Sequence, residues 1–512
     1  MRKVLISALL VLAALGAPPG GGIALAQTAE PPDMVSRFTR GRFVLDRAVE
    51  AAGGANAIRS IRTLRFAAEG DVTNDLQGFN PSRIGRPEVD GSYRIETAFE
   101  LPNGRFFQRV TQRTRGNYGL DASTIYRDGT LYLLRHFGRD YTATPNAPSP
   151  LGPGGAGLFN LRLAPAALLQ RALQNFRSVA LVGDGEIGGR PTHIIEFSFD
   201  ESTRLRLHVT QGDHRVRRVD ALAPESIAAD DVTYGLYEGD QVIDGVWFPE
   251  RVSINRRDVP VLSLMLRDIS LGALPETLFA LPVDFALVAD DQLTITNVAG
   301  RIHEVSGLGG GLFRIQFVIM EDFIVAYESG GSVQTAQTAI NEIRRVEPNK
   351  PIRYAVISHY HNDHAGGVGA YVDLGATIVS SPENEAALRQ YAAARPQFAG
   401  LEGRRAHIEM RFQPVGDEGF DIADAAGRRV RVLSLTGGPH VEHLLTLYDP
   451  ETRALLTADL YSPVVGFSET SAGFARWLRR RVVPVDSVLA SHSAPVPVAR
   501  VFEAERAARR RR

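Results

Sequence analysis

The feature that most constrains this chain is a run of histidines that directly follows an apolar, strand-like segment. The segment YAVIS, residues 354–358, is followed by HYHNDH, residues 359–364. Functional side chains in α/β sheets commonly lie at the carboxyl ends of buried strands, so these side chains are expected at such an edge. The potential metal ligands, at positions i, i+2, i+4 and i+5, are His359, His361, Asp363 and His364. Four donors this close together cannot all reach one small tetrahedral ion, so the spacing predicts two neighbouring ions.

Three further candidate ligands follow later strand-like segments. His440 lies in TGGPHVEH after residues 429–434, Asp459 ends ALLTAD, and His492 ends VLASH. Because each candidate ends a strand-like run, all of them are expected to converge on one edge of a sheet. Neutral imidazoles combined with a few carboxylates suit Zn²⁺. The alternative is a polar surface turn that happens to be rich in histidine, and the distant partners argue against it.

This ordered set of motifs resembles the metallo-β-lactamase superfamily of hydrolases, over about residues 290–500. The resemblance implies an α/β fold, in which an αββα sandwich is preceded here by a mostly antiparallel β domain with one or two helices. It also implies two Zn²⁺ ions per chain. The first ion would be held by His359, His361 and His440, the second by Asp363, His364 and His492, and Asp459 would bridge the pair. A hydroxide between the ions would attack the substrate, with Asp363 as the catalytic residue that orients it.

The chain departs from the superfamily pattern at positions beside these ligands. Val441 follows His440 where the family often has threonine, and Ala458 precedes Asp459 where glycine is usual. Both changes bear on the shape of the pocket more than on the metal. The strand expected over residues 322–327 is followed by Glu328, at a position where the superfamily usually has aspartate. Glu328 is therefore expected to support the site through backbone amides.

Two residues near the ligands have open roles. His443 is three residues past His440 and starts a strand, so it is expected to cap the loop or point away, because other ligands already fill both sites. Tyr461 is two residues past Asp459. It is either a residue of the pocket or a residue of the core.

The composition limits the classes of protein to which the chain can belong. Its 512 residues exceed what one hydrophobic core usually supports, so two domains are expected. Cysteine is absent, which excludes disulfides, a cysteine nucleophile and thiolate metal ligands. The net charge is −1, so nothing favours nucleic acid as a partner. A small-molecule substrate is expected instead.

The sequence of the first half of the chain predicts a β-rich domain over residues 34–285. The apolar spacing is helical over about 34–61, and a second helix is expected over 165–176. Short alternating runs such as residues 204–209 predict a mostly antiparallel sheet, with His208 on its wet face. The end of this half loosely resembles the lipoprotein-carrier type of open barrel. It is therefore either a domain that takes an apolar ligand or a plain structural sheet.

Residues 286–500 form the second predicted domain, in which strands and helices alternate, and residues 501–512 form an arginine-rich tail. Strands are expected at 293–298, 312–319, 322–327, 354–358, 429–434, 443–448 and 453–458, and helices at 333–346 and 383–394. All the candidate ligands fall in this domain. The sequence therefore predicts that the second domain builds the site by itself.

Residues 1–26 have the pattern of a cleaved secretory signal. Arg2 and Lys3 precede an apolar run, residues 4–17, that is too short to cross a bilayer. Ala24-Leu25-Ala26 supplies the small-x-small cleavage pattern. The alternative is a membrane anchor. No later segment is apolar enough to cross a membrane, so the mature protein is expected to be periplasmic or secreted, with no integral membrane span.

The details of the motifs narrow the expected reaction. By resemblance, true zinc β-lactamases carry cysteine or lack a bridging aspartate at the position of Asp459, and the redox di-iron branch typically has glutamate at that of His361. The long insert of the nucleic-acid-cutting branch is missing between His440 and Asp459. What remains resembles the ester, thioester and lactone hydrolases, so an exported zinc-dependent hydrolase is expected. The alternatives are an envelope ligand-binding or scaffolding protein with a vestigial metal site, and a β-lactam or phosphodiester hydrolase.

Overall fold

The structure is a computed structural model that describes residues 33–510 with short gaps. The gaps are residues 74, 87, 102–103, 115–118, 152–156, 201–202, 226–228, 289–291, 310–312, 395–408, 439, 463–467 and 481–482. The predicted signal, residues 1–26, therefore lies outside the described residues.

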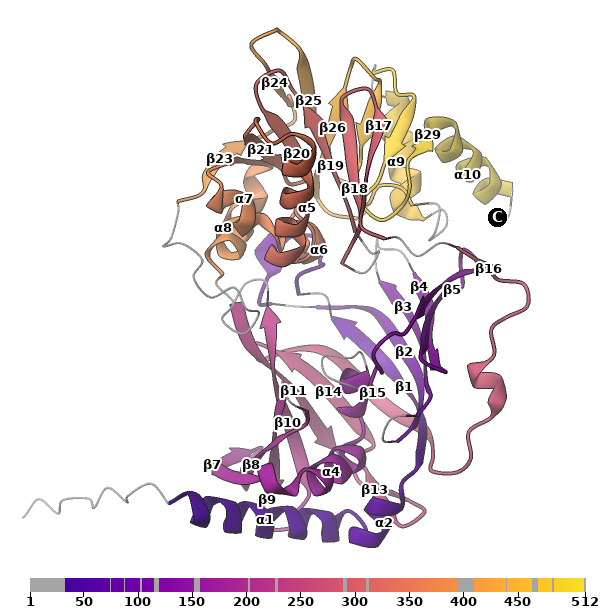
Figure 1. Cartoon of the computed structure of the whole chain (residues 1–512), viewed down its shortest axis with the longest axis vertical. Coiled ribbons are helices and arrows are strands. Elements are labelled where there is room, and N and C mark those ends of the chain that lie inside the picture. Colours follow the sequence, from indigo (N-terminus) through magenta and orange to yellow (C-terminus); the bar gives the residue numbers. More distant parts are fainter. Residues whose placement is uncertain are drawn as a thin grey trace, which may run out of the picture.

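The first half of the chain forms one large curved sheet of fourteen strands (Figure 1). Its strands are β1 (Thr63–Thr73), β2 (Val89–Glu100), β3 (Phe106–Thr114), β4 (Leu120–Arg127), β5 (Thr130–Arg135), β6 (Asp140–Pro145), β7 (Ala180–Ile187), β8 (Arg190–Ser198), β9 (Arg204–Thr210), β10 (Val216–Glu225), β11 (Ala229–Glu238), β14 (Arg251–Arg256), β15 (Val259–Ser270) and β16 (Ala286–Leu287). They run in the order β16-β6-β5-β4-β3-β2-β1-β15-β14-β11-β10-β9-β8-β7. Every neighbouring pair is antiparallel except β16 and β6. Two short strands, β12 (Gln241–Ile243) and β13 (Val246–Phe248), pair separately.

Helices close one end of this sheet and fill its core. They are α1 (Met34–Ala51), α2 (Ala55–Ser60), α3 (Gly157–Leu161) and α4 (Pro165–Gln174). The expected helical region divides into α1 and α2 at Gly53 and Gly54, whose φ angles of 120° and 89° lie in the region that favours glycine. Apolar side chains of α1 and α4 pack together with those of the strands in one buried core. A cavity beside α4, lined by residues such as Leu161, Ala167 and Phe199, has a volume of about 20 Å³. An apolar ligand in this half stays a prediction.

The strand alternation predicted for residues 204–209 is present in β9, with one correction. Leu205 and Leu207 are buried, and Arg204 and Arg206 are exposed. His208, expected on the wet face, is buried. Its Nε2 atom lies 2.9 Å from a carboxylate oxygen of Asp220 on β10. The alternation of the sequence predicts an exposed His208, but in the structure His208 is buried and has a carboxylate partner on the next strand.

The second half forms two sheets packed face to face, with helices on both outer faces (Figure 1). The first sheet holds, in spatial order, β17 (Thr294–Ala299), β18 (Ile302–Leu308), β19 (Phe313–Ile319), β20 (Ile324–Tyr327), β21 (Ile352–Val356), β22 (Thr377–Ser380) and β23 (Arg411–Pro414). The second holds β24 (Phe420–Ala423), β25 (Arg429–Thr436), β26 (His443–Asp449), β27 (Ala454–Leu456), β28 (Ser487–Leu489) and β29 (Val496–Pro497). The helices are α5 (Val333–Val346), α6 (Asn362–Ala365), α7 (Val368–Asp373), α8 (Glu385–Ala393), α9 (Glu469–Arg480) and α10 (Val498–Arg510).

The arrangement of these layers is the predicted αββα sandwich. Side chains such as Val318 and Val356 from the first sheet meet Val432 and Leu456 from the second in a continuous buried cluster. A second buried cluster lies under the helices. The predicted fold class, a mixed α/β sandwich after a mostly antiparallel β domain, is therefore confirmed.

Two features refine the predicted outline of the chain. Strand β16 still belongs to the first sheet through its parallel pairing with β6, so that sheet reaches Leu287. The arginine-rich end begins inside α10, with Arg509 and Arg510 in the last helical turn, where cations complement the helix dipole. Among the described residues, no helix has the length and apolar content that a bilayer crossing requires.

Candidate metal centre

The first run of candidate ligands leaves the sandwich at the carboxyl end of β21. His359, His361 and His364 are all buried, the last within α6. Two glycines that follow let this turn pack against the segment after β20. A Cβ atom on Gly366 would lie 2.5 Å from the carbonyl oxygen of Gly331, and one on Gly367 would lie 2.2 Å from another carbonyl oxygen. The glycines of HAGG are therefore required by close packing beside the ligands.

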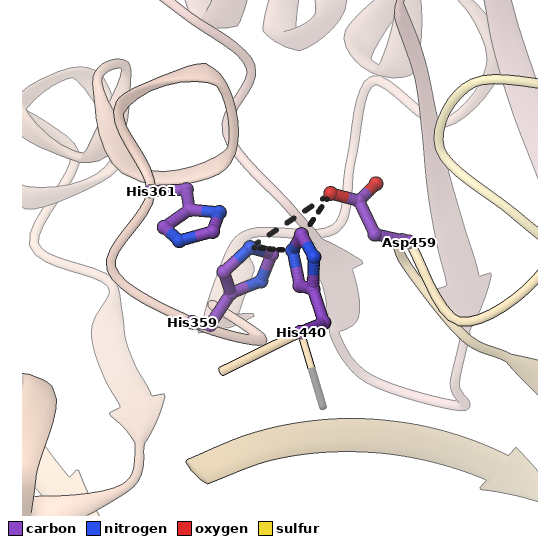
Figure 2. Close-up of side chains that lie close together, drawn as sticks. All are labelled: His359, His361, His440 and Asp459. Carbon is purple, nitrogen blue, oxygen red and sulfur yellow. Dashed lines mark hydrogen bonds and ion pairs between the residues drawn. The ribbon is translucent and has the colours of Figure 1, made fainter. Parts of the chain in front are cut away.

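His359, His361, His440 and Asp459 form the first of two clusters, which we call the three-histidine group. Their candidate ligand atoms lie within 4.8 Å of one another, and all four side chains are buried. Nε2 of His440 is 3.2 Å from Nε2 of His359 and 3.2 Å from Oδ2 of Asp459. The ring of His361 lies 4.4 Å from that of His359. Figure 2 shows the three imidazoles and the carboxylate gathered around one point.

Asp363, His364, His492 and Asp459 form the second cluster, which we call the two-carboxylate group. Nε2 of His364 lies 3.0 Å from Oδ2 of Asp459, and Nε2 of His492 lies 3.2 Å from Oδ1 of the same carboxylate. Oδ2 of Asp363 lies 3.6 Å from Nε2 of His492. Asp459 thus belongs to both groups, and its two oxygens face different histidines.

Burial and neighbouring imidazoles keep two donors of the three-histidine group, His359 and His361, neutral. Burial lowers the pKa of His359 well below its usual range, and the neighbouring imidazoles lower it further. Burial, with a contribution from His440, lowers the pKa of His361 to about 3. Neutral imidazole is the form of histidine that binds a metal. These two donors are therefore ready to bind at neutral pH without losing a proton.

The two-carboxylate group is charged in the absence of metal. Burial opposes protonation of His364, but the nearby carboxylates, Asp459 first, raise its pKa well above the usual range. Burial also opposes protonation of His492, but the charge of Asp459 outweighs this effect and raises the pKa of His492 to about 10. Burial would raise the pKa of Asp363 and of Asp459, but the charge of His364 holds both below the usual value. The group is a network of ion pairs.

Glu328 supports this network from the end of β20, as its position in the sequence predicted. Its Oε1 atom accepts a hydrogen bond from the backbone N–H of Ser358 at 3.2 Å, and its Oε2 atom lies 3.1 Å from Nδ1 of His364. The residue is buried and has a φ angle of 76°, in the left-handed region that most side chains avoid.

Ala458, beside Asp459, has a φ angle of 48°. This conformation explains why glycine is usual there.

Two residues from the first half of the chain also contact the candidate ligands, and the sequence did not point to them. Nε2 of His361 lies 2.8 Å from the carbonyl oxygen of Gly78. Nε2 of Gln77 donates a hydrogen bond of 2.6 Å to Oδ1 of Asp363. Both belong to the connection between β1 and β2. Its one signal in the sequence is length, since antiparallel neighbours are usually joined by only a few residues.

The two ambiguous residues lie outside both groups. His443, on β26, has its Nδ1 atom 3.7 Å from a carboxylate oxygen of Glu383. Tyr461 is buried, and its hydroxyl donates to the carbonyl oxygen of Arg500 at 3.4 Å. His443 therefore pairs away from the ligands, as expected. Tyr461 belongs to the core beneath α10.

The donor set fits metal ions of the zinc type. Because Nε2 of His361 is held by a carbonyl oxygen, Nδ1 is the ring nitrogen left for a metal, and it is buried without a hydrogen-bond partner among the described residues. His359 is arranged in the opposite sense. Its Nδ1 lies 2.7 Å from Ser358 Oγ, and its Nε2 faces the group. Imidazoles and carboxylates in two adjacent sets suit two such ions.

Solved structures that are similar to part of this chain include metallo-beta-lactamases and an alkylsulfatase. A metallo-beta-lactamase from Pontibacter korlensis is 17% identical over 41% of this chain and 96% of its own, with a TM-score of 0.32. One from Hirschia baltica is 14% identical over 41% of this chain and 95% of its own, with a TM-score of 0.31. A stereoselective inverting sec-alkylsulfatase from Pseudomonas sp. is 17% identical over 41% of this chain and 40% of its own, with a TM-score of 0.30. A comparison with curated proteins gives no match.

The family model described as the metallo-beta-lactamase superfamily matches residues 325–463. This segment includes every candidate ligand except His492. The resemblance recognised in the sequence is therefore confirmed, and it is residues 325–463 that match the metallo-β-lactamase superfamily.

Proposed function

We propose that this chain is an exported, zinc-dependent hydrolase that binds two zinc ions and acts on an ester, thioester or lactone-type carbonyl. The observation that carries the proposal is the convergence of seven donor side chains from four separate loops into two groups that share Asp459. A buried carboxylate shared between two sets of imidazoles is costly to maintain unless its charge is compensated. In the metal-free protein the protonated His364 and His492 supply that compensation, and bound cations would take over this role.

A pair of zinc ions supplies Lewis acidity and lowers the pKa of a water molecule, so that a nucleophile forms at neutral pH. The residues of the chain do the remaining work. Asp459 joins the two groups, because its Oδ2 atom lies 3.2 Å from Nε2 of His440 and its Oδ1 atom lies 3.2 Å from Nε2 of His492. Glu328 and Ser358 fix the orientation of the imidazoles behind them.

Asp363 is the residue to which we assign proton transfer. Its side chain is 29% exposed, whereas that of Asp459 is 7% exposed. Asp363 is therefore the more exposed of the two carboxylates of this centre, and we assign it to the side from which a substrate would enter. The charge of His364 holds the pKa of Asp363 below its usual value in the metal-free protein, so the carboxylate is ionised at neutral pH and can orient an attacking water. We also assign to it the passage of the proton of that water to a leaving group within hydrogen-bond reach.

The substrate class and the location rest on the sequence. The aspartate at 459 and the absence of cysteine favour the ester, thioester and lactone hydrolases over β-lactamases, by resemblance. The pattern of residues 1–26 favours export to the periplasm or beyond. We therefore propose a small molecule available outside the cytoplasm as the substrate.

A hydrolysis panel tests this function. The zinc-loaded full-length protein is offered lactones, thioesters, carboxylic esters, phosphodiesters and β-lactams, and zinc content is measured on the same sample. We expect two zinc ions per chain and turnover of a carbonyl substrate that a chelator abolishes and Zn²⁺ restores. Turnover that survives complete metal removal would contradict the mechanism. A protein that binds no zinc would favour a binding or scaffolding role.

A further inference from the structure

The connection between β1 and β2 leaves the first sheet toward the sandwich (Figure 1) and contacts two of the four loops that carry candidate ligands. We call residues 75–80 the docking loop. The carbonyl oxygen of Leu76 accepts a hydrogen bond of 3.2 Å from the backbone N–H of Asn362, beside the first ligand run. The carbonyl oxygen of Phe79 accepts one of 3.0 Å from the N–H of Glu442, beside His440. The docking loop therefore spans the two segments that carry five of the seven donors.

Within this loop, Gln77 is placed to fix the orientation of one donor. Its side-chain amide nitrogen donates to Oδ1 of Asn362 and to Oδ1 of Asp363, each at 2.6 Å. Both partners are acceptors, so the amide is held in one orientation. Because Oδ1 of Asp363 is engaged, Oδ2 is the oxygen turned toward His492, at 3.6 Å. Gln77 thus decides which oxygen of the carboxylate faces the two-carboxylate group.

The next residue does the same for the other group. The carbonyl oxygen of Gly78 lies 2.8 Å from Nε2 of His361, and it also accepts a hydrogen bond of 2.7 Å from the hydroxyl of Tyr360. A carbonyl oxygen accepts only, so the proton of His361 stays on Nε2 and Nδ1 carries the lone pair. Contacts of this kind tune metal ligands in many proteins.

The docking loop is also anchored to other parts of the first half of the chain through Asp75. Asp75 is buried, and one of its oxygens accepts a hydrogen bond of 2.6 Å from the N–H of Gly85. Its other oxygen pairs with Arg257, in the turn between β14 and β15. Both contacts lie within the first half of the chain. The docking loop is therefore presented to the sandwich by the first sheet as a preformed element.

From these contacts we infer that the first half of the chain is a working part of the metal centre. Gln77 and Gly78 are positioning residues, each for one ligand of one group, and together they set metal affinity and geometry from outside the sandwich. The inference rests on the proposed function, since it concerns the same zinc ligands. It also replaces the expectation that the second half builds the site by itself.

The test uses two variants of the full-length protein. Gln77→Ala removes the donor to Asp363, and Ser82→Ala removes an exposed hydroxyl from the same connection as a matched control. Zinc affinities are measured by competition with a chromophoric chelator, and the visible absorption of the Co²⁺-substituted protein reports ligand geometry. Thermal unfolding of the metal-free proteins reports the fold.

For Gln77→Ala we expect the affinity of one ion to fall about 10- to 100-fold, as is usual when a partner of a ligand is removed. The affinity of the other ion and the unfolding temperature should match those of Ser82→Ala, and the Co²⁺ spectrum should change. Equal affinities in both variants would overturn the inference and leave the proposed function intact. A parallel loss of both ions with a lower unfolding temperature would show that the loop supports only the fold. A wild-type protein that binds no zinc would overturn the proposed function itself.

Discussion

The two groups of the metal centre share Asp459 but differ in charge. In the three-histidine group, burial keeps His359 and His361 neutral. In the two-carboxylate group, carboxylates hold His364 and His492 in their protonated form. The first group therefore offers free lone pairs, whereas the second has to exchange protons for a metal ion. Two adjacent sites built from the same residue types are therefore not equivalent. We expect the three-histidine group to bind its metal ion first.

The largest effect is expected from removing the shared carboxylate. Asp459→Ala should lower the content of both ions and reduce turnover by more than the 10- to 100-fold usual for loss of a ligand's partner. Zinc analysis and kcat/KM measure the two effects, and circular dichroism checks the fold. Asp486→Ala, which removes a largely exposed carboxylate before β28, is the control. A variant that keeps both ions and full turnover would contradict the shared role.

Removing one histidine from each group in turn should distinguish the metal affinities of the two groups. His440→Ala should lower zinc content to about one ion per chain and weaken the tighter of the two sites. His492→Ala should also leave about one ion, but the tighter site should keep its affinity. Chelator competition on both variants measures this difference. Indistinguishable binding curves would show that the groups are equivalent and would refute the loading order.

A smaller effect is expected from changing Glu328, which supports the two-carboxylate group through His364. Glu328→Gln removes the charge that faces Nδ1 of His364 and should reduce turnover about 10- to 100-fold. Only the weaker zinc site should lose affinity, because Glu328 contacts no imidazole of the three-histidine group in the described hydrogen bonds. Competition titration checks this selectivity. Weakening of the tighter site alone would reverse the comparison.

The smallest effect concerns the stability of the metal-free protein against pH. The raised pKa of His492 means that its ion pairs stabilise the fold fully below about pH 6.5, the usual histidine value, and that this contribution is lost as the pH rises toward about 10. The lowered pKa values of Asp363 and Asp459 place their contribution above about pH 4. The thermal unfolding temperature should therefore be a few degrees lower at pH 9 than at pH 6.

His492→Ala supplies the control for this pH dependence. It removes the imidazole whose titration is invoked, so the difference between pH 6 and pH 9 should shrink. Scanning calorimetry of the metal-free proteins measures it. A wild-type protein that is more stable at pH 9 would contradict the assigned charges.

The sandwich was predictable because its signals are local. The helix expected over residues 333–346 is α5 with the same bounds, and the strand expected over 312–319 is β19, Phe313–Ile319. The donors of the first run are spaced within six residues, and the remaining three each follow a strand-like run. The bounds of these elements follow from strand and helix periodicity, whereas the αββα arrangement and the assignment of the donors to two ions came from the resemblance to the superfamily.

The docking loop and the buried His208 were not predictable in this way. Gln77 and Asp363 are 286 residues apart, and no periodicity in either segment reports on the other. His208 alternates correctly along β9, but its burial depends on Asp220 of the neighbouring strand. Contacts between elements override local preference, and a single sequence carries little information about them.

The hydrogen bond from His361 to the carbonyl oxygen of Gly78 has a consequence for how the molecule assembles. Metal binding and docking of the two halves are thermodynamically linked through it, so each must favour the other by the same free energy. Under the proposed function, zinc would hold the two halves together as well as act as a cofactor. A newly made chain would then reach its full metal affinity only after both the first sheet and the sandwich have folded. Scarcity of the metal would accordingly loosen the joint between the halves before it unfolds either one.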